Sequence, residues 1–213
     1  MDLKNKLDEI ISDLTKDKPM ALMRKGQRFY SAGDTPQRLF FIKEGLVGLM
    51  QSSLQGTESL LRVFKKDQVF GHRSFFAGEK YHLAAVALDD SQYIQIDKEE
   101  IYSYFASSPE KYLVVIQILA RELRRAEQRS LVLSEGNIIE RVAYTLLLFK
   151  KLYSDRLWTR TEIASFCGSR TPTVIKALGD LEKMSIIRQE RREIEIINEE
   201  ALVNLVFHFA DEI

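Results

Sequence analysis

The period of the hydrophobic positions changes once along the chain, close to residue 98. Before that point, short alternating or wholly apolar runs occupy residues 27–30, 39–42, 47–51, 60–64, 83–88 and 92–96. Turn-forming residues, among them Gly26, Gly33, Gly45 and Asp90, separate these runs. Several short strands at spacings of about 8–12 residues are typical of a β-sandwich or a jelly-roll barrel. Residues 20–98 are therefore predicted to form a β-domain.

A short amphipathic helix is predicted ahead of the strands. Its apolar residues recur at helical spacing and share one face: Leu3, Leu7, Ile10, Ile11 and Leu14. The stretch has no basic start leading into an apolar core, so it is not expected to be a signal peptide.

A long helix is predicted after residue 98. Pro109 and Glu110, behind two serines, are typical of a helix start. The apolar steps that follow alternate between four and three residues, as in a two-stranded coiled coil. This pattern predicts a dimer interface through Tyr112, Ile116, Leu119, Leu123, Ala126, Ser130 and Leu133. The alternative is a helix that packs only on its own barrel.

Further helices are predicted once Gly136 ends the long helix. Asn137 and Glu140 have the spacing of a capping box for a helix that reaches about residue 153. Thr159 and Glu162 repeat that spacing at the start of a shorter helix.

Gly168 is predicted to end the short helix, and Pro172 stands in the first turn of another. This last helix is expected to bury its apolar side chains, namely Val174, Leu178, Leu181 and Met184. Residues 186–188 and 193–197 then predict a two-stranded wing around a charged turn at 189–192.

Composition narrows the function classes. The chain has 213 residues, 45% of them hydrophobic, and a formal net charge of zero, so a nucleic-acid surface would have to be local. Cys167 is the only cysteine, which excludes an intramolecular disulfide, a four-cysteine iron–sulfur cluster and a zinc site built on cysteines. No apolar run approaches the roughly 18–20 residues that span a bilayer. We expect a cytoplasmic protein.

Two helices joined by a glycine-containing turn and followed by a wing are the parts of a winged helix-turn-helix. In such domains the second helix enters the major groove, and its N-terminal side chains reach base edges. Residues 156–193 carry eight Lys or Arg against five Asp or Glu. We expect this excess to bind DNA, through Arg160, Arg170, Lys176, Arg188, Arg191 and Arg192. Two alternatives remain: the basic residues form an ordinary solvated surface, or the protein is a signalling adaptor whose winged helix binds protein.

Three motifs resemble those of the Crp–Fnr superfamily of transcription regulators. The stretch TRTEIASFCGSRTPTVIKAL, residues 159–178, is similar to the family signature TRxEIA…GxSRxTVxRxL. FFIKEG at 40–45 and DQVFG at 67–71 are similar to segments of its sensor domain. The resemblance implies an α+β chain: a jelly-roll sensor domain (1–106), a dimerisation helix (107–136) and a winged helix-turn-helix (137–213).

The resemblance also implies DNA contacts at matching positions: Thr159, Arg160, Ser169, Arg170, Thr171, Thr173, Lys176 and Arg191. Arg160 would contact a phosphate. Where members often read bases with an Arg followed by a Glu, this chain has Thr171 and Pro172. Losing a bidentate Arg–guanine contact removes about 1–3 kcal/mol of discrimination, so the family's usual half-site is not expected.

A ligand pocket is implied within VFGHRSFFAGEKYHLAAVA, residues 69–87, and on the long helix: Gly71, His72, Arg73, Ser74, His82, Leu83, Ala126 and Glu127. In members that bind cyclic nucleotides, a Glu holds the ribose, and an Arg beside a Ser or Thr holds the phosphate. The corresponding residues here are His72, His82 and Leu83, and base-contacting positions fall at Ala126 and Glu127. Leu83 cannot hydrogen-bond and Glu127 would repel a phosphate, so cyclic AMP is not expected in the usual pose.

Other interpretations of the pocket stay open. The basic side chains His72, Arg73, Lys80 and His82 could take a different anion, although we favour two half-exposed turn histidines in a vestigial pocket. Metal or haem ligation lacks a suitably spaced partner, and a cupin-type enzyme lacks its histidine cluster, since the third histidine, His208, is near the C-terminus. Cys167 is expected to be a buried hydrophobe rather than a redox switch. No catalytic residue, metal or cofactor is expected.

The expected function is therefore that of a bacterial homodimeric transcription regulator. It would bind a pseudo-palindromic operator and, if an activator, RNA polymerase; its effector is unknown. A regulator without any small ligand, controlled by its abundance, is the alternative.

Overall fold

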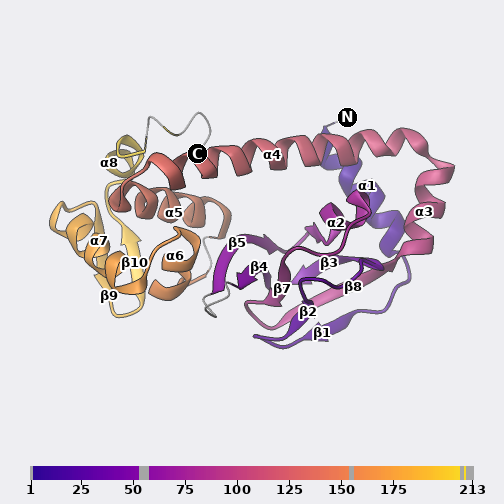
Figure 1. Ribbon diagram of the computed structural model, residues 1–213, viewed down its shortest axis with the longest axis horizontal. Coiled ribbons are helices and arrows are strands. Elements are labelled where there is room, and N and C mark those ends of the chain that lie inside the picture. Colours follow the sequence, from indigo (N-terminus) through magenta and orange to yellow (C-terminus); the bar gives the residue numbers. More distant parts are fainter. Residues whose placement is uncertain (1, 53–57, 154–155, 207–208, 210–213) are drawn as a thin grey trace. The chain divides into compact units, whose positions relative to one another are not determined.

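The structure is a computed structural model that describes residues 2–52, 58–153, 156–206 and 209 (Figure 1). His208 lies outside the described residues. The chain divides into two compact units, Met1–Gln55 with Leu61–Leu123 and Gly56–Leu60 with Arg124–Ile213. None of the helices in the described ranges combines the length and the apolar character needed to cross a membrane.

Two four-stranded sheets form the first unit. Their strand orders are β1-β8-β3-β6 and β2-β7-β4-β5. The bounds are Ala21–Met23 for β1, Arg28–Tyr30 for β2, Arg38–Glu44 for β3, Leu46–Ser52 for β4, Glu58–Lys65 for β5, Val69–Phe70 for β6, Ala84–Ala87 for β7 and Ser91–Asp97 for β8. Each of the six runs predicted as strands is a strand. The short strands β1 and β6 were not predicted as separate strands.

Aromatic side chains fill the space between the sheets. Phe40, Phe70 and Tyr93 come from one sheet, and Tyr30 and Phe64 from the other. Phe40 and Phe70 stack with ring centroids 5.0 Å apart. Large rings inside the sandwich account for the apolar runs that the strands show in the sequence.

Helices cover one outer face of this unit. α1 (Leu3–Thr15) is the predicted amphipathic helix, and its Ile10 and Leu14 pack with Leu39 of β3 and Ile96 of β8. α3 (Lys98–Ser107) adds Ile101 to the same cluster. The first turns of α4 (Tyr112–Glu135), which follow a 3₁₀ turn at Pro109–Lys111, contribute apolar contacts as well.

Two helices of this unit were not predicted. α2 (His72–Ala77) lies between Gly71 and Gly78, whose φ angles of 89° and 69° are left-handed, and its six residues are too few for a helical period. α3 begins with a capping box between Asp97 and Glu100, which follows the last strand without any turn residue.

The second unit is helical, with a small β-hairpin. α5 (Ile138–Tyr153) begins at the predicted capping box, in which the backbone N–H of Asn137 donates to Glu140 Oε2 at 2.8 Å. The other elements are α6 (Arg160–Phe166), α7 (Thr171–Lys183), β9 (Ile187–Glu190), β10 (Glu193–Ile196) and α8 (Glu199–Asn204). β9 and β10 pair antiparallel and form the predicted wing, with a turn shortened to residues 191–192.

One predicted core residue of α7 is wrong. Met184 is 53% exposed, because the helix ends at Lys183 and Met184 is its C-cap. Ala177 is buried instead, together with Val174, Leu178 and Leu181. The prediction extended the apolar spacing by one turn too many.

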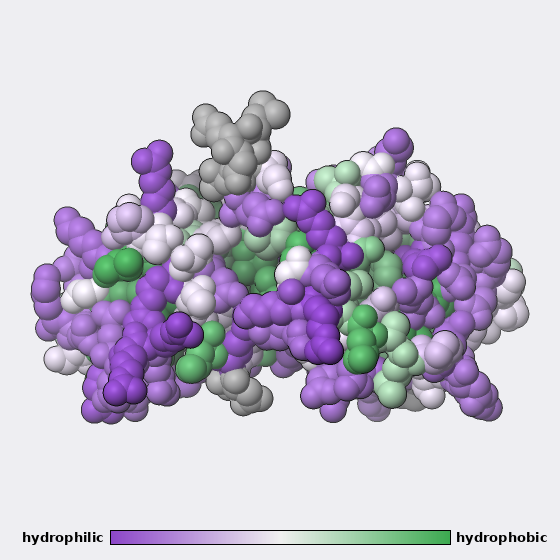
Figure 2. Space-filling model, turned by 90° about the horizontal axis from the view of Figure 1, so that it is seen from below, coloured by the Kyte–Doolittle hydropathy of each residue, from purple (hydrophilic) through white to green (hydrophobic). Residues whose placement is uncertain are grey.

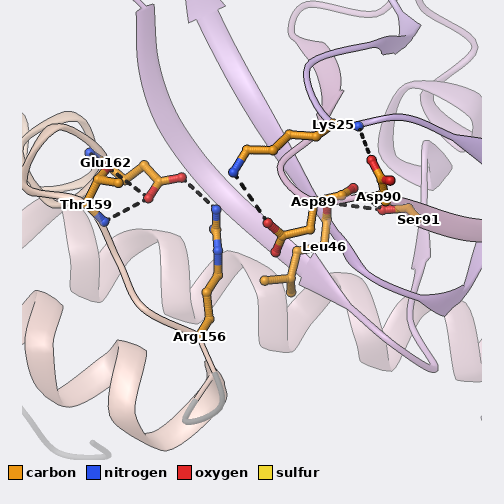
Figure 3. Close-up of polar contacts among 8 residues, drawn as sticks. All are labelled: Lys25, Leu46, Asp89, Asp90, Ser91, Arg156, Thr159 and Glu162. Atoms are coloured by element: carbon orange, nitrogen blue, oxygen red, sulfur yellow. Dashed lines mark hydrogen bonds and ion pairs between the residues drawn. The ribbon is translucent and has the colours of Figure 1, made fainter. Parts of the chain in front are cut away.

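The turn between β3 and β4 gives a sharp test of the sandwich. Gly45 has a φ of +92°, and a Cβ there would clash with Ser91 Oγ and lie 2.6 Å from the carbonyl oxygen of Asp90. The side-chain carboxylate of Asp90 accepts from the backbone N–H of Lys25 at 2.9 Å, which ties this turn to the loop before β2 (Figure 3). Gly78 also has a positive φ, 69°, but nothing lies within 4 Å of its Cβ position.

We therefore expect Gly45→Ala to destabilise the protein far more than Gly78→Ala. The left-handed backbone alone costs about 1–2 kcal/mol, which is the loss expected for Gly78→Ala. Overpacking adds about 1–3 kcal/mol at Gly45. Urea unfolding followed by circular dichroism measures both, and equal losses would contradict the close approach at Gly45.

Candidate DNA-binding surface and sensor pocket

A capping box fixes the start of α6. Glu162 donates its backbone N–H to Thr159 Oγ1 at 3.2 Å, and the Thr159 N–H donates to Glu162 Oε2 at 2.9 Å. Arg156 Nη2 donates to the other carboxylate oxygen at 2.7 Å (Figure 3). The Arg156 guanidinium also stacks over Trp158, 4.3 Å from its ring centroid. These contacts hold the first helix rigidly at its N-terminus.

The turn between α6 and α7 contains the single cysteine. Cys167 caps α6 and is 1% exposed, and burial raises the pKa of its thiol to about 11. Such a thiol carries almost no reactive thiolate at neutral pH. Gly168 follows with a φ of +63°, which turns the chain toward α7. Cys167 is thus placed as a packing residue.

α7 presents a polar and cationic face at its N-terminal half. Arg170 is the N-cap, and Pro172 stands in the first turn, as predicted. Arg170, Thr173 and Lys176 are exposed, whereas Ser169 and Thr171 are half-buried. In the part of the chain that the structure describes, neither Arg170 nor Lys176 forms an ion pair.

Arg160 and Arg188 are engaged within the protein, whereas Arg191 is exposed. Arg160 donates to the carbonyl oxygen of Arg192 at 2.7 Å and to Gln189 Oε1 at 3.1 Å, so it ties α6 to the wing. Arg188 pairs with Glu195 across the hairpin at 2.5 Å. Arg191 stands at the exposed tip of the wing with a φ of +52°, a left-handed conformation that is uncommon outside glycine.

The sensor pocket is a cavity of about 20 Å³ inside the first unit. Its lining includes six of the eight predicted pocket residues, Gly71, His72, Arg73, Ser74, His82 and Leu83, together with Tyr30, Leu49, Phe64 and Tyr81. Tyr30 and Tyr81 stack with ring centroids 3.6 Å apart. A cavity of this size has room for about one water molecule.

A residue that sequence reasoning missed dominates the pocket's electrostatics. Glu122 of α4 is 6% exposed and accepts from Arg62 at 2.5 Å, from Arg73 at 2.8 Å and from His72 at 3.1 Å. Burial raises the pKa of its carboxyl, but the hydrogen bond and charge of His72 and the charge of Arg62 lower it more, so the net shift is well below the ordinary value. The available signal was a Glu at helical spacing from Val115 and Ile118, on the face that packs against the barrel.

The structure corrects the interpretation of the two histidines as half-exposed turn residues. His72 is 8% exposed and lies in α2, with its Nε2 against Glu122. His82 is exposed. Ala126 and Glu127 are exposed on α4 and are not among the residues that line the cavity. Lys80 is exposed too, so the proposed basic cluster reduces to His72 and Arg73, joined by Arg62.

The face of the protein in Figure 2 is mainly hydrophilic, with separate hydrophobic spots. Large exposed apolar side chains do occur on α4, where Ile116 is 59% and Leu123 60% exposed. Tyr112 is 37% exposed, Ala126 and Ser130 are exposed, and Leu119 and Leu133 are half-buried. The seam predicted for dimerisation therefore lies largely open to solvent in the single chain.

Comparisons with known proteins agree with this architecture. Residues 22–108 match the cyclic nucleotide-binding domain family, and residues 140–205 match the Crp-like helix-turn-helix domain family. A "CRP-like cAMP-activated global transcriptional regulator" of Mycobacterium tuberculosis is 27% identical over 201 residues, which cover 90% of each chain. The "Fumarate and nitrate reduction regulatory protein" of Vibrio cholerae is 24% identical over 210 residues, covering 94% of this chain and 82% of the relative.

Solved structures share the fold. FixK2 from Bradyrhizobium japonicum superposes with a TM-score of 0.79 at 23% identity, covering 88% of this chain and 96% of that one. The sheet sandwich, the long helix and the winged helix-turn-helix occur in the same order in this chain. The protein therefore belongs to the Crp–Fnr family of DNA-binding transcription regulators.

Proposed function

We propose that the protein is a cytoplasmic homodimer that binds a pseudo-palindromic operator through α6, α7 and the wing. The observation that carries this proposal is the exposed N-terminal half of α7, where Arg170, Thr173 and Lys176 face solvent and neither cation has an acidic partner among the described residues. A helix of this kind fits the major groove, and its first residues reach base edges and phosphates.

The contacts follow from how each cation is engaged. Within the described ranges Arg170 and Lys176 have no ion pair to give up, so they are the main groove-facing contacts, and Arg191 at the wing tip reaches a neighbouring phosphate. Arg160 is occupied by the wing and acts mainly as a brace. Thr159, Ser169 and Thr171 are secondary contacts, because the capping box or partial burial restricts their side chains.

The dimer forms along the α4 seam. A row of exposed large apolar side chains on a long helix marks a surface that another chain covers. Two copies joined there would present their α7 helices to half-sites about 34–36 Å apart. We retain the division into a sensor domain, a dimerisation helix and a DNA-binding domain for this assembly.

The sensor domain does not bind cyclic AMP in the usual pose. Ligand pockets for small molecules have volumes of about 300–1,000 Å³, whereas this cavity measures about 20 Å³. The relative from Mycobacterium tuberculosis is named for activation by cAMP, but this chain has His82 and Leu83 where phosphate-binding groups are needed. RNA polymerase is a partner if the protein activates transcription.

Replacing Arg170 and Lys176 together by Ala should weaken binding to a duplex selected from a random-sequence library by the native protein. For each phosphate that the variant no longer neutralises, the slope of log K against log salt should decrease in magnitude by about 0.9. Fluorescence anisotropy at several salt concentrations measures both the affinity and the slope.

Lys183→Ala is the matched control, because Lys183 lies at the other end of α7 and pairs with Asp180 at 3.0 Å. Its affinity and slope should be those of the native protein. Unchanged binding by the double variant would show that α7 is not the recognition helix, and salt-independent affinity of the native protein would remove the DNA proposal itself.

Ile116→Asp with Leu123→Asp should convert the dimer into monomers, because charges on the seam cannot be buried against a second copy. Both side chains are exposed in the single chain, so its circular dichroism spectrum should not change. Gln117→Asp introduces one negative charge off the seam and should leave the dimer intact. Sedimentation velocity measures the oligomeric state of each variant. A double variant that is still dimeric would show that the dimer does not form along this face of α4.

A further inference from the structure

Three basic side chains converge on one buried carboxylate. Arg62 of β5 contacts Glu122 Oε1, and Arg73 and His72 of α2 contact Glu122 Oε2. The Glu122 side chain is 7% exposed and those of its partners 10–34%. Both oxygens of the carboxylate are therefore engaged by groups from two different elements of the barrel.

Glu122 is the one acidic group that the contacts of this cluster share. Two guanidinium groups and one imidazole face a single carboxylate, and the Arg62 guanidinium also stacks over Phe64, 4.5 Å from the ring centroid. The Glu122 carboxylate, whose side chain is only 7% exposed, needs such partners to remain ionised inside the protein. The barrel thus offers a small anion-binding site, and α4 supplies the anion.

The site is continuous with the sensor cavity. His72 and Arg73 belong to both, and His72 Nδ1 is buried without a hydrogen-bond partner among the described residues. The cavity has a volume of about 20 Å³, so it does not accommodate a nucleotide beside the carboxylate. A free anion could take the position of this carboxylate only where Glu122 is absent.

We propose that Glu122 is the internal ligand of the sensor domain: its carboxylate occupies the anion-binding site and holds α4 on the barrel without a small-molecule effector. The proposal rests on the proposed function in one respect, that the state of α4 governs DNA binding. It explains why the pocket keeps cationic groups although the residues expected to hold a cyclic nucleotide are missing.

An internal ligand differs from an ordinary structural ion pair in what its removal leaves behind. Glu122→Ala should leave a carboxylate-sized space lined by Arg62, His72 and Arg73, and acetate or formate should bind there. Removing one member of a buried ion pair should lower the Tm by roughly 10 °C. Saturable binding of acetate should restore about 5 °C of that loss.

The test compares thermal melts of the full-length protein in sodium acetate and in sodium chloride at equal ionic strength. Glu122→Ala should gain Tm in acetate only, whereas the native protein and Glu127→Ala, with its exposed carboxylate on the same helix, should not. Cyclic AMP should change none of the three. The proposal would be overturned if acetate did not raise the Tm of Glu122→Ala. It would also be overturned if acetate or cyclic AMP raised the Tm of the native protein.

Glu122→Gln keeps the shape of the side chain and covers the case in which the Ala variant does not fold. The carboxyl pKa is lowered in the folded state relative to an ordinary value of 4.5, so its contribution is complete above that pH and decreases below it. The Tm difference between native protein and Glu122→Gln should shrink as the pH falls below about 4.5. A difference independent of pH would contradict an ionised Glu122.

DNA binding separates the two proposals. On the selected duplex, Glu122→Ala should bind more weakly than the native protein and recover in acetate, measured by anisotropy at constant ionic strength. If acetate does not restore DNA binding by Glu122→Ala, while the Arg170 and Lys176 double variant still binds more weakly than the native protein, only the internal-ligand proposal is rejected. If replacing Arg170 and Lys176 does not weaken DNA binding, the DNA proposal is rejected. The thermal melts in acetate and chloride then test the role of Glu122 independently.

Discussion

A carboxylate with little access to water must be neutralised by its neighbours, and in the sensor domain this requirement joins three elements. Glu122 brings α4 to β5 and α2 through Arg62, His72 and Arg73. The first turns of α4 pack in the apolar cluster that α1 and α3 complete. Hydrophobic contacts tolerate small shifts of the helix, but hydrogen bonds of 2.5–3.1 Å to both carboxylate oxygens do not. The ion cluster therefore sets the position of α4 along its axis.

The DNA-binding unit distributes its cations by the same principle. Three arginines have partners within this unit: Arg156 pairs with Glu162, Arg160 donates to the wing backbone, and Arg188 pairs with Glu195. These contacts connect the elements of the winged helix-turn-helix. Arg170 and Lys176 have no such acidic partner in the part of the chain that is described. A neutral chain thus acquires a local positive surface without a large net charge, because the arginines that support the structure are neutralised where they stand.

Much of the fold was accessible from the sequence, and the failures have physical reasons. Strands bounded by turn residues and helices with capping boxes, as at Asn137 and Thr159, were found because their signals are local. α2 is too short to show a period, and α3 follows a strand without a break. Glu122 was missed because its partners are 49 to 60 residues away in the sequence, so only the folded barrel brings them together. The pocket residues of α2 were found through a motif, but the burial of His72 depends on the same distant contact.

Two faces of α4 carry the buried Glu122 and the proposed dimer seam. Successive residues of an α-helix are about 100° apart around its axis, so Leu123 lies on a different face from Glu122, although the two are neighbours in the chain. Glu122 is buried against the barrel, while Leu123 is 60% exposed. A helix moves as a rigid rod over one turn, and a displacement that breaks the contacts of Glu122 must also rotate or shift Leu119 and Leu123. In the proposed dimer, the geometry of the seam would therefore depend on the occupation of the anion site, and with Glu122 as the resident carboxylate that geometry would be specified by the protein's own sequence.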